Sequence, residues 1–166
     1  ENNHEVQTSW YFPADSLLLV MRPHMHLRGK AFRYEAIYPD GTEEILLDVP
    51  QFDFNWQNNY VLAEPKEIPG GTEMRCTAWF DNSEDNLSNP DPTATVRWGD
   101  QTTDEMMIGI FAMALADQDL LKQSTPQVAD SRGGPWLPLT FLAVAVVAAG
   151  VYLARGRHTV RRESES

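Results

Sequence analysis

Residues 31–49 read AFRYEAIYPDGTEEILLDV, and this stretch decides the fold class. Apolar and polar side chains alternate through residues 31–38, as they do in a strand with one buried face. Pro39-Asp40-Gly41 follows with a fixed φ, an aspartate that bonds the local backbone and a glycine that tolerates positive φ, so a tight turn is predicted. Residues 43–49 return with strand composition, and the two runs together predict an antiparallel hairpin.

Strand-like runs continue on both sides of this hairpin. Further strands are predicted at residues 5–12, 16–21, 60–62 and 72–80. Residues 105–115 are mostly apolar and, taken alone, fit a helix as well as a strand. Because many short runs are bounded by turn signals, we expect an all-β fold: an antiparallel β-sandwich, similar to a jelly roll, over residues 1–122.

The main candidate for chemistry is the stretch Pro23-His24-Met25-His26-Leu27-Arg28-Gly29-Lys30. In a strand, His24 and His26 would point to the same face, because they lie two positions apart. Pro23 favours an edge or a bulge at this point. Two neutral imidazoles on one face form half of a transition-metal site, although histidines this close also occur in ordinary packing.

A softer ligand is offered by Thr102-Thr103-Asp104-Glu105-Met106-Met107. A thioether beside two imidazoles suits copper that cycles through Cu(I), and it is a poor ligand for zinc. A methionine in an apolar run is usually a core residue, so this stretch alone is not sufficient evidence of a metal site.

These motifs in this order resemble one family. His24-Met25-His26-Leu27-Arg28-Gly29-Lys30, then Arg75-Cys76, then Thr103-Asp104-Glu105-Met106 are similar to the C-terminal domain of the copper type II ascorbate-dependent monooxygenases, which include peptidylglycine α-hydroxylating monooxygenase and dopamine β-hydroxylase. The resemblance runs roughly over residues 4–114. It implies a strand at residues 105–115 and one copper ion held by His24, His26 and Met106.

The resemblance also implies a reaction that needs two metal centres. In this family, the C-terminal copper binds oxygen next to the substrate carbon, and a copper in the N-terminal domain stores the second electron, which ascorbate supplies. This sequence has no second histidine cluster, since only His4 and His158 remain. We therefore expect the chain to work with a partner, or with a missing N-terminal portion, that supplies the second copper or electron. No catalytic residue is assigned beyond the metal ligands.

Cys76 is the single cysteine, so an internal disulfide is excluded. The matching cysteine of animal family members is disulfide-bonded, and that bond would be absent here. We expect Cys76 to pack inside a strand as a small apolar residue. His4 lies outside the implied ligand set.

An uncharged segment, WLPLTFLAVAVVAAGVYLA, occupies residues 136–154. At the rise of an α-helix it spans about 28 Å, close to the thickness of the bilayer core, so we predict a single transmembrane helix. Residues 123–135 form a polar linker, and residues 155–166 form a tail with four arginines. The positive-inside rule places that tail in the cytoplasm and the sandwich outside it, in the periplasm if the cell is Gram-negative. This placement requires an export signal, so either a leader has been removed or the chain is a piece of something longer.

The acidic composition of the chain excludes one class of binding partner. Residues 1–132 carry 22 acidic and 9 basic side chains, and the whole chain of 166 residues has a net charge of −11. Nucleic-acid binding requires a basic surface, so nucleic acid is not expected as a partner. The expected partners are the membrane and proteins that contact the transmembrane helix and the sandwich.

Two functions remain open at this point. The first is a membrane-anchored copper monooxygenase domain, incomplete as a single chain, that uses ascorbate or another electron donor. The second is a non-catalytic accessory subunit of a larger membrane complex, for example a respiratory or photosynthetic one, that keeps only the fold. The intact set of implied ligands favours the first function, and the predicted membrane helix favours the second.

Overall fold

The computed structural model describes residues 1–118 and, as a strand, residues 143–149. The predicted linker at residues 123–135, the basic tail at residues 155–166 and the two ends of the predicted span lie outside the described residues.

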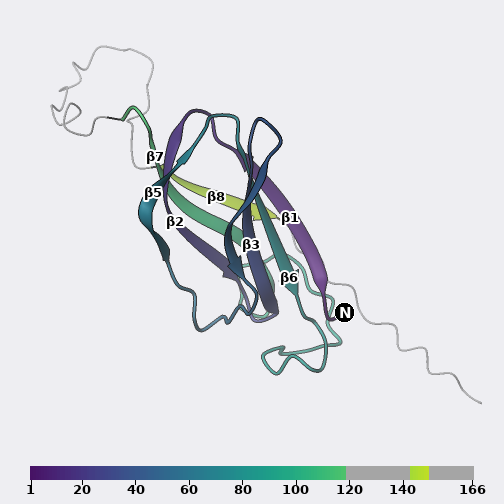
Figure 1. Cartoon of the computed structure of the whole chain (residues 1–166). Helices are drawn as coiled ribbons and strands as arrows, with labels where there is room; N and C mark the ends of the chain where they lie inside the picture. Colours follow the sequence, from purple (N-terminus) through teal and green to yellow (C-terminus); the bar gives the residue numbers. More distant parts are fainter. Residues whose placement is uncertain (119–142, 150–166) are drawn as a thin grey trace, which may run out of the picture.

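The described residues form two four-stranded antiparallel sheets, which confirms the predicted all-β class (Figure 1). The strands are β1 (His4–Tyr11), β2 (Ser16–Met25), β3 (Gly29–Ile37), β4 (Glu43–Val49), β5 (Tyr60–Ile68), β6 (Glu73–Phe80), β7 (Met107–Leu115) and β8 (Ala143–Ala149). One sheet has the order β1-β6-β3-β4, and the other has the order β5-β2-β7-β8. No helix occurs within residues 1–118 or 143–149.

The predicted hairpin is β3 and β4, and its turn has the expected chemistry. Tyr38 N–H donates to Thr42 O at 2.8 Å, and Thr42 N–H donates to Asp40 Oδ1 at 2.9 Å. Gly41 has a φ of 85°, a conformation that side chains with a Cβ rarely adopt. Local turn chemistry therefore fixes the pairing of β3 with β4.

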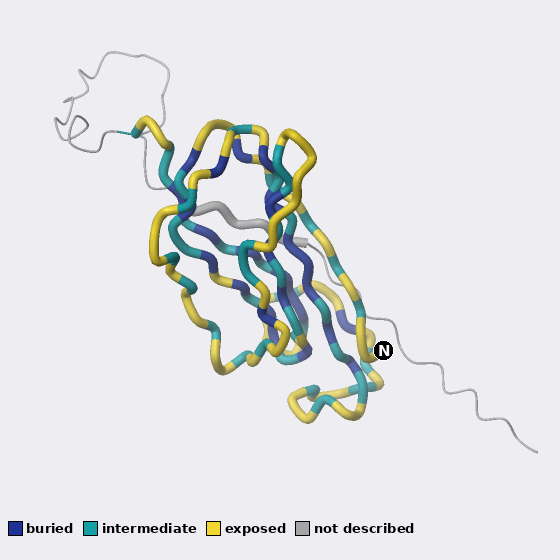
Figure 2. Tube along the Cα trace, in the orientation of Figure 1, coloured by how far each residue is buried: buried dark blue, intermediate teal, exposed yellow. Residues whose placement is uncertain are grey.

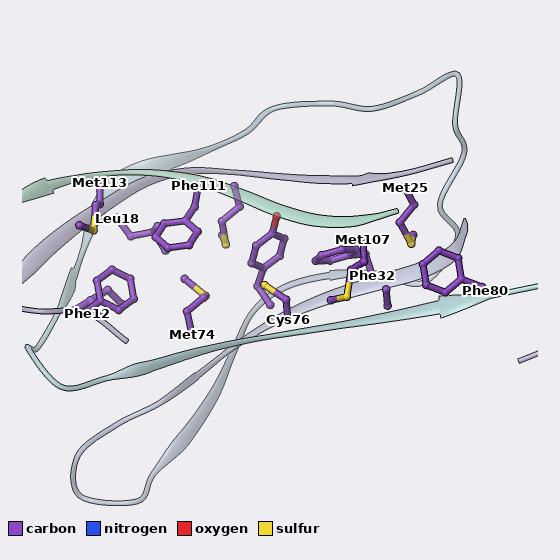
Figure 3. Packing of buried hydrophobic residues seen from close by; sticks show 14 of the residues in the cluster. Phe12, Leu18, Met25, Phe32, Met74, Cys76, Phe80, Met107, Phe111 and Met113 are labelled. Atoms are coloured by element: carbon purple, nitrogen blue, oxygen red, sulfur yellow. The ribbon is translucent and has the colours of Figure 1, made fainter. Parts of the chain in front are cut away.

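The core lies between the two sheets. Buried positions alternate along the strands, so that the inner face of each sheet is apolar (Figure 2). Five of the six methionines belong to this core, together with Cys76, which is buried as predicted. Met25 and Met107 lie with Phe32 and Phe80 at one end of the core (Figure 3). This is the end at which β2 leads into the histidine pair.

Two irregularities in β2 set the geometry near the histidines. A register shift between Leu18 and Val20 inserts a bulge, so Leu18 points into the core while Val20 lies on the outer face. Pairing with β5 ends at Met21, whereas pairing with β7 continues to Met25. Pro23 therefore lies where β2 has only one neighbouring strand, as its missing N–H requires.

β5 is longer than the sequence predicts, because the prediction ended this strand before Pro65. The register of β5 with β2 shifts between Lys66 and Val61, so Pro65 lies in the irregular part of an edge strand. Proline is tolerated at such a position, since it removes no hydrogen bond of a regular ladder.

β8 lies inside the segment that was predicted to be a transmembrane helix. Ala143–Ala149 pairs antiparallel with β7, from Met113↔Ala143 to Met107↔Ala149. Its β-branched valines are compatible with a strand. The structure thus gives a strand for these seven residues, and the helix over residues 136–154 stays a prediction. Among the described residues, no helix is long and apolar enough to cross a membrane.

Candidate metal centre

The three predicted ligands come from the adjoining ends of β2 and β7. The register of these strands pairs His24 with Ile108 and Met25 with Met107. Continuing this register by one residue places His26 opposite Met106. His24, His26 and Met106 then lie on the outer face of the sheet, because side chains alternate and Met25 and Met107 point inward.

The two imidazoles lie close together. Their ring centroids are 5.3 Å apart, and the ring planes are nearly perpendicular at 89°. His26 is buried, with 4% of its surface exposed, while His24 is half-buried. The predicted sharing of a face by the two histidines therefore holds, although His26 lies just beyond the last residue of β2.

A glutamine fixes the tautomer of His24. Gln57, in the loop between β4 and β5, donates from Nε2 to Phe54 O at 2.9 Å. This bond turns Gln57 Oε1 toward His24 Nδ1, at 2.5 Å. Since Oε1 only accepts, Nδ1 of His24 must carry the proton. In the neutral imidazole, Nε2 then keeps its lone pair, and this is the tautomer that can bind a metal through Nε2.

The same logic applies to His26. Its Nδ1 lies 3.3 Å from the carbonyl oxygen of Asp104, which can only accept a hydrogen bond. Burial lowers the pKa of His26 below its ordinary value, against the opposing effect of the Asp104 carbonyl, and the neighbouring His24 lowers it further. Burial thus favours the neutral form of His26, whose ring lies against the backbone carbonyls of Asp104 and Gln101.

Glu105 clamps the backbone that follows β2. Its carboxylate is fully buried and accepts His26 N–H at 3.0 Å and Arg28 N–H at 2.6 Å. Burial raises the pKa of Glu105 to about 7, while the two N–H donors and the charge of Arg28 oppose this shift. Asp104 and Glu105 thus both act on His26, through the ring and through the backbone respectively.

Arg28 joins the loops around this clamp. Its side chain is 1% exposed, and it donates to Asn82 Oδ1 at 2.8 Å and to Thr103 O at 2.8 Å, with a longer contact to Asp91 O at 3.5 Å. A buried guanidinium requires such partners, because an unsatisfied charge in the interior is costly. Arg28 therefore holds the segment before Met106 against the end of β2.

Met106 and Met107 have different surroundings, as expected for adjacent side chains on opposite faces of a strand. Met107 is fully buried in the core between the sheets (Figure 3). Met106 is 7% exposed and does not belong to that core cluster. Strand alternation therefore assigns Met106, rather than Met107, to the histidine side of the sheet.

Among the described residues, the other acidic and histidine side chains do not gather into a site. His4 Nδ1 contacts Glu1 Oε1 at 3.2 Å. Within residues 1–118, no group of three or more His, Cys, Asp or Glu side chains is arranged to hold a metal ion.

Sequence reasoning did not predict the roles of Gln57, Asp104 and Glu105. The acidic pair was visible next to Met106, but nothing local indicated that it reaches His26, which lies 79 residues from Glu105 in the chain. Gln57 gave no signal, because it lies in a loop between two strands without any recognised motif.

Comparison with known proteins adds no identification. The chain matches no protein-family model and no curated protein sequence. The resemblance to copper monooxygenases therefore rests on the motifs of this sequence alone.

Proposed function

We propose that His24, His26 and Met106 bind one copper ion, and that the sandwich is the oxygen-binding copper half of a monooxygenase. A partner supplies the second copper or the second electron, from ascorbate or another donor. The proposal includes the jelly-roll type of sandwich that the short strands and turn signals predict.

One observation carries this proposal: both imidazoles are anchored through Nδ1. Gln57 Oε1 and the Asp104 carbonyl each lie within hydrogen-bonding distance of one Nδ1, an arrangement that leaves Nε2 as the nitrogen of each neutral ring that can bind a metal. A pair of histidines that served only in packing would not need both tautomers fixed in the same sense.

Each residue has a distinct part in holding the metal. The imidazoles of His24 and His26 are intermediate ligands that suit either oxidation state of copper, and the thioether of Met106 favours Cu(I). Copper bound in this way supplies one-electron redox chemistry with oxygen. Glu105 keeps the backbone of His26 in place, and Phe54, whose ring centroid lies 6.1 Å from that of His26, covers part of the buried imidazole.

The second candidate is an accessory subunit of a membrane complex. It is favoured by the histidine content of the described residues, in which His4 is the only histidine besides the pair and is engaged with Glu1. The described part of the chain therefore lacks a second copper site of the histidine type. This candidate predicts that the copper site is vestigial.

Titration with Cu(I) against a competing chelator separates the two candidates. We expect His24→Ala and His26→Ala to abolish tight binding, because each removes an imidazole ligand. Met106→Ile should weaken Cu(I) more than Cu(II), since it removes only the soft ligand.

The matched control is Met107→Ile. Met107 is adjacent in sequence but belongs to the core, so this near-isosteric change should leave copper bound and cost at most about 1.5 kcal/mol of stability. If the unmodified chain binds Cu(I) no better than His24→Ala, the copper proposal fails and the accessory subunit becomes the better description.

We further propose that residues 136–154 anchor the sandwich in a membrane, with residues 155–166 in the cytoplasm. The support is the length of the uncharged segment and the four arginines that follow it.

A further inference from the structure

β7 (Met107–Leu115) differs in composition from every other strand within residues 1–118. It contains no aspartate, glutamate, lysine, arginine or proline, whereas each of β1 to β6 contains at least one of these residues. Charges and prolines protect the open edges of native sheets, and the edge strands β1, β4 and β5 all carry them. β7 therefore has the composition of a strand with a neighbour on both sides.

Within residues 1–118, β7 has only one neighbouring strand, β2. Its second edge is paired with β8, from Met113↔Ala143 to Met107↔Ala149, and β8 also lies next to β1 (Figure 1). A chain whose residues 136–154 cross a bilayer cannot keep this pairing. The N–H and C=O groups along this edge of β7 would then need another partner.

We propose that, in the membrane-anchored protein, this edge of β7 binds an extended segment of a partner protein by strand addition. The proposal rests on the proposed membrane anchor and is independent of copper. In this mode of binding, backbone hydrogen bonds supply the affinity, and side chains that alternate between two faces supply the selectivity. The partner's segment takes the place of β8, so it runs antiparallel to β7.

The two faces of β7 define the side chains of this segment. Met107, Phe111 and Met113 are buried on the inner face, while Ile108 and Ile110 lie on the outer face. A charged side chain on the inner side of the added strand would lose its water without gaining a polar partner. The paired part of the segment is therefore uncharged, with the β-branched or small apolar residues that pack well beside such a strand.

Charge at the end of β7 defines the flank of the segment. Asp15 and Asp117 lie together there, and no basic side chain of the described residues lies with them. In the register of β8, the residues that precede the added strand reach this end of β7, so a lysine or arginine is favoured at that point.

The same charges argue against a second copy of this chain as the occupant. Two antiparallel copies of β7, with Met107 opposite Met113, would place Asp117 of one copy opposite Thr103 and next to Asp104 of the other. Like charges at such positions oppose pairing. The occupant is therefore a different protein with a basic flank.

The test uses the full chain without metal in phosphatidylcholine nanodiscs, and it measures hydrogen exchange of the β7 amides. The probe is a peptide of two lysines followed by AVAVVAA, the sequence of residues 143–149. In the chain alone, we expect fast exchange for those amides of residues 107–113 that point away from β2. Saturating peptide should slow their exchange by about tenfold or more.

Two N-methylated forms of the peptide are matched controls, with methyl groups on one or the other set of alternate residues. Because an added strand pairs through one edge only, one form should lose binding and the other should keep it. A peptide with two glutamates in place of the lysines should bind about tenfold more weakly.

Three results would overturn the site: β7 amides that are protected before the peptide is added, peptide protection that maps to another strand, or equal effects of the two N-methylated forms. Equal binding of the glutamate peptide would overturn the basic flank of the occupant. Loss of the chain from the nanodiscs would overturn the membrane anchor together with this proposal, which separates that failure from failure of the strand site alone.

Discussion

A residue without a side chain allows the two sheets to approach at the centre of the molecule. Gly109 lies on the inner face of β7, where a Cβ would come within 2.6 Å of Cys76 Sγ and 3.3 Å of Tyr34 Cε1. Contacts of 2.6 Å between such atoms do not occur in relaxed cores. Gly109 therefore sets the spacing between β7 and β6 at this point.

Gly109→Ala is expected to destabilise the fold by about 1–3 kcal/mol through overpacking. Adding Cys76→Ala removes the sulfur that the new methyl group meets, so the double variant should recover part of the loss. Urea unfolding of the two single variants and the double variant measures this coupling in a double-mutant cycle. Strictly additive effects would contradict the contact.

Cys76 also predicts a pH dependence. Burial raises the pKa of its thiol above the ordinary value of 9.0, so the native state keeps a proton that the unfolded chain releases in alkali. The thiol's contribution to stability is therefore present below about pH 9 and is lost as the pH rises, by up to about 1.4 kcal/mol per pH unit. Burial also raises the pKa of Tyr34. Tyr34 is present in the Cys76→Ala variant as well, so comparison with that variant isolates the effect of the thiol.

The measurement is the free energy of unfolding of the unmodified chain minus that of Cys76→Ala, at pH 7 and at pH 10. We expect this difference to fall with increasing pH. A constant difference would mean that the thiol titrates equally in both states.

At the scale of elements, the loop between β4 and β5 controls the histidine pair. Gln57→Ala should leave the sandwich folded, because the loop packs at the edge of β2 and Gln57 is not a core residue. It should let the His24 proton move to Nε2 and should lower Cu(I) affinity by about 10- to 100-fold. The ¹⁵N shifts of the His24 ring in the metal-free chain report the tautomer directly.

Gln51→Ala is the matched control, since Gln51 lies in the same loop and makes no hydrogen bond to either histidine among the described residues. An unchanged His24 tautomer in Gln57→Ala would show that the glutamine does not position the ring.

Strands whose bounds depend on residues close in sequence could be predicted. β4 was predicted with the bounds it has, because the Pro39-Asp40-Gly41 turn and the alternation of residues 31–38 act within the hairpin. The predicted strand at residues 60–62 was shorter than β5. Proline is usually excluded from strands, but it is tolerated in the irregular part of an edge strand, where Pro65 lies.

The candidate site was predictable only in part for the same reason. Strand parity is a local property, and it placed His24 and His26 on one face. The clamp by Glu105 depends on the register between β2 and β7, which sequence patterns alone do not reveal. The resemblance identified Met106 but not the acidic residues that support His26.

At the scale of the whole molecule, charge is distributed unevenly along the chain. The first 132 residues carry most of the acidic side chains, while residues 155–162 contain four arginines and no acid. The uncharged segment lies between these two parts. In the structure its middle forms β8 beside β7, and one segment cannot pair with β7 and cross a bilayer at the same time.

Protease treatment of intact spheroplasts tests the anchored arrangement. With residues 136–154 in the membrane, added protease should digest the acidic sandwich and spare a tag placed after Ser166, because arginine-rich flanks stay on the cytoplasmic side. The control is the same chain with residues 136–154 deleted, which should appear in the soluble periplasmic fraction. Digestion of the tag would reverse the orientation. Release of the intact, undeleted chain without detergent would mean that Ala143–Ala149 stays in the sheet as β8.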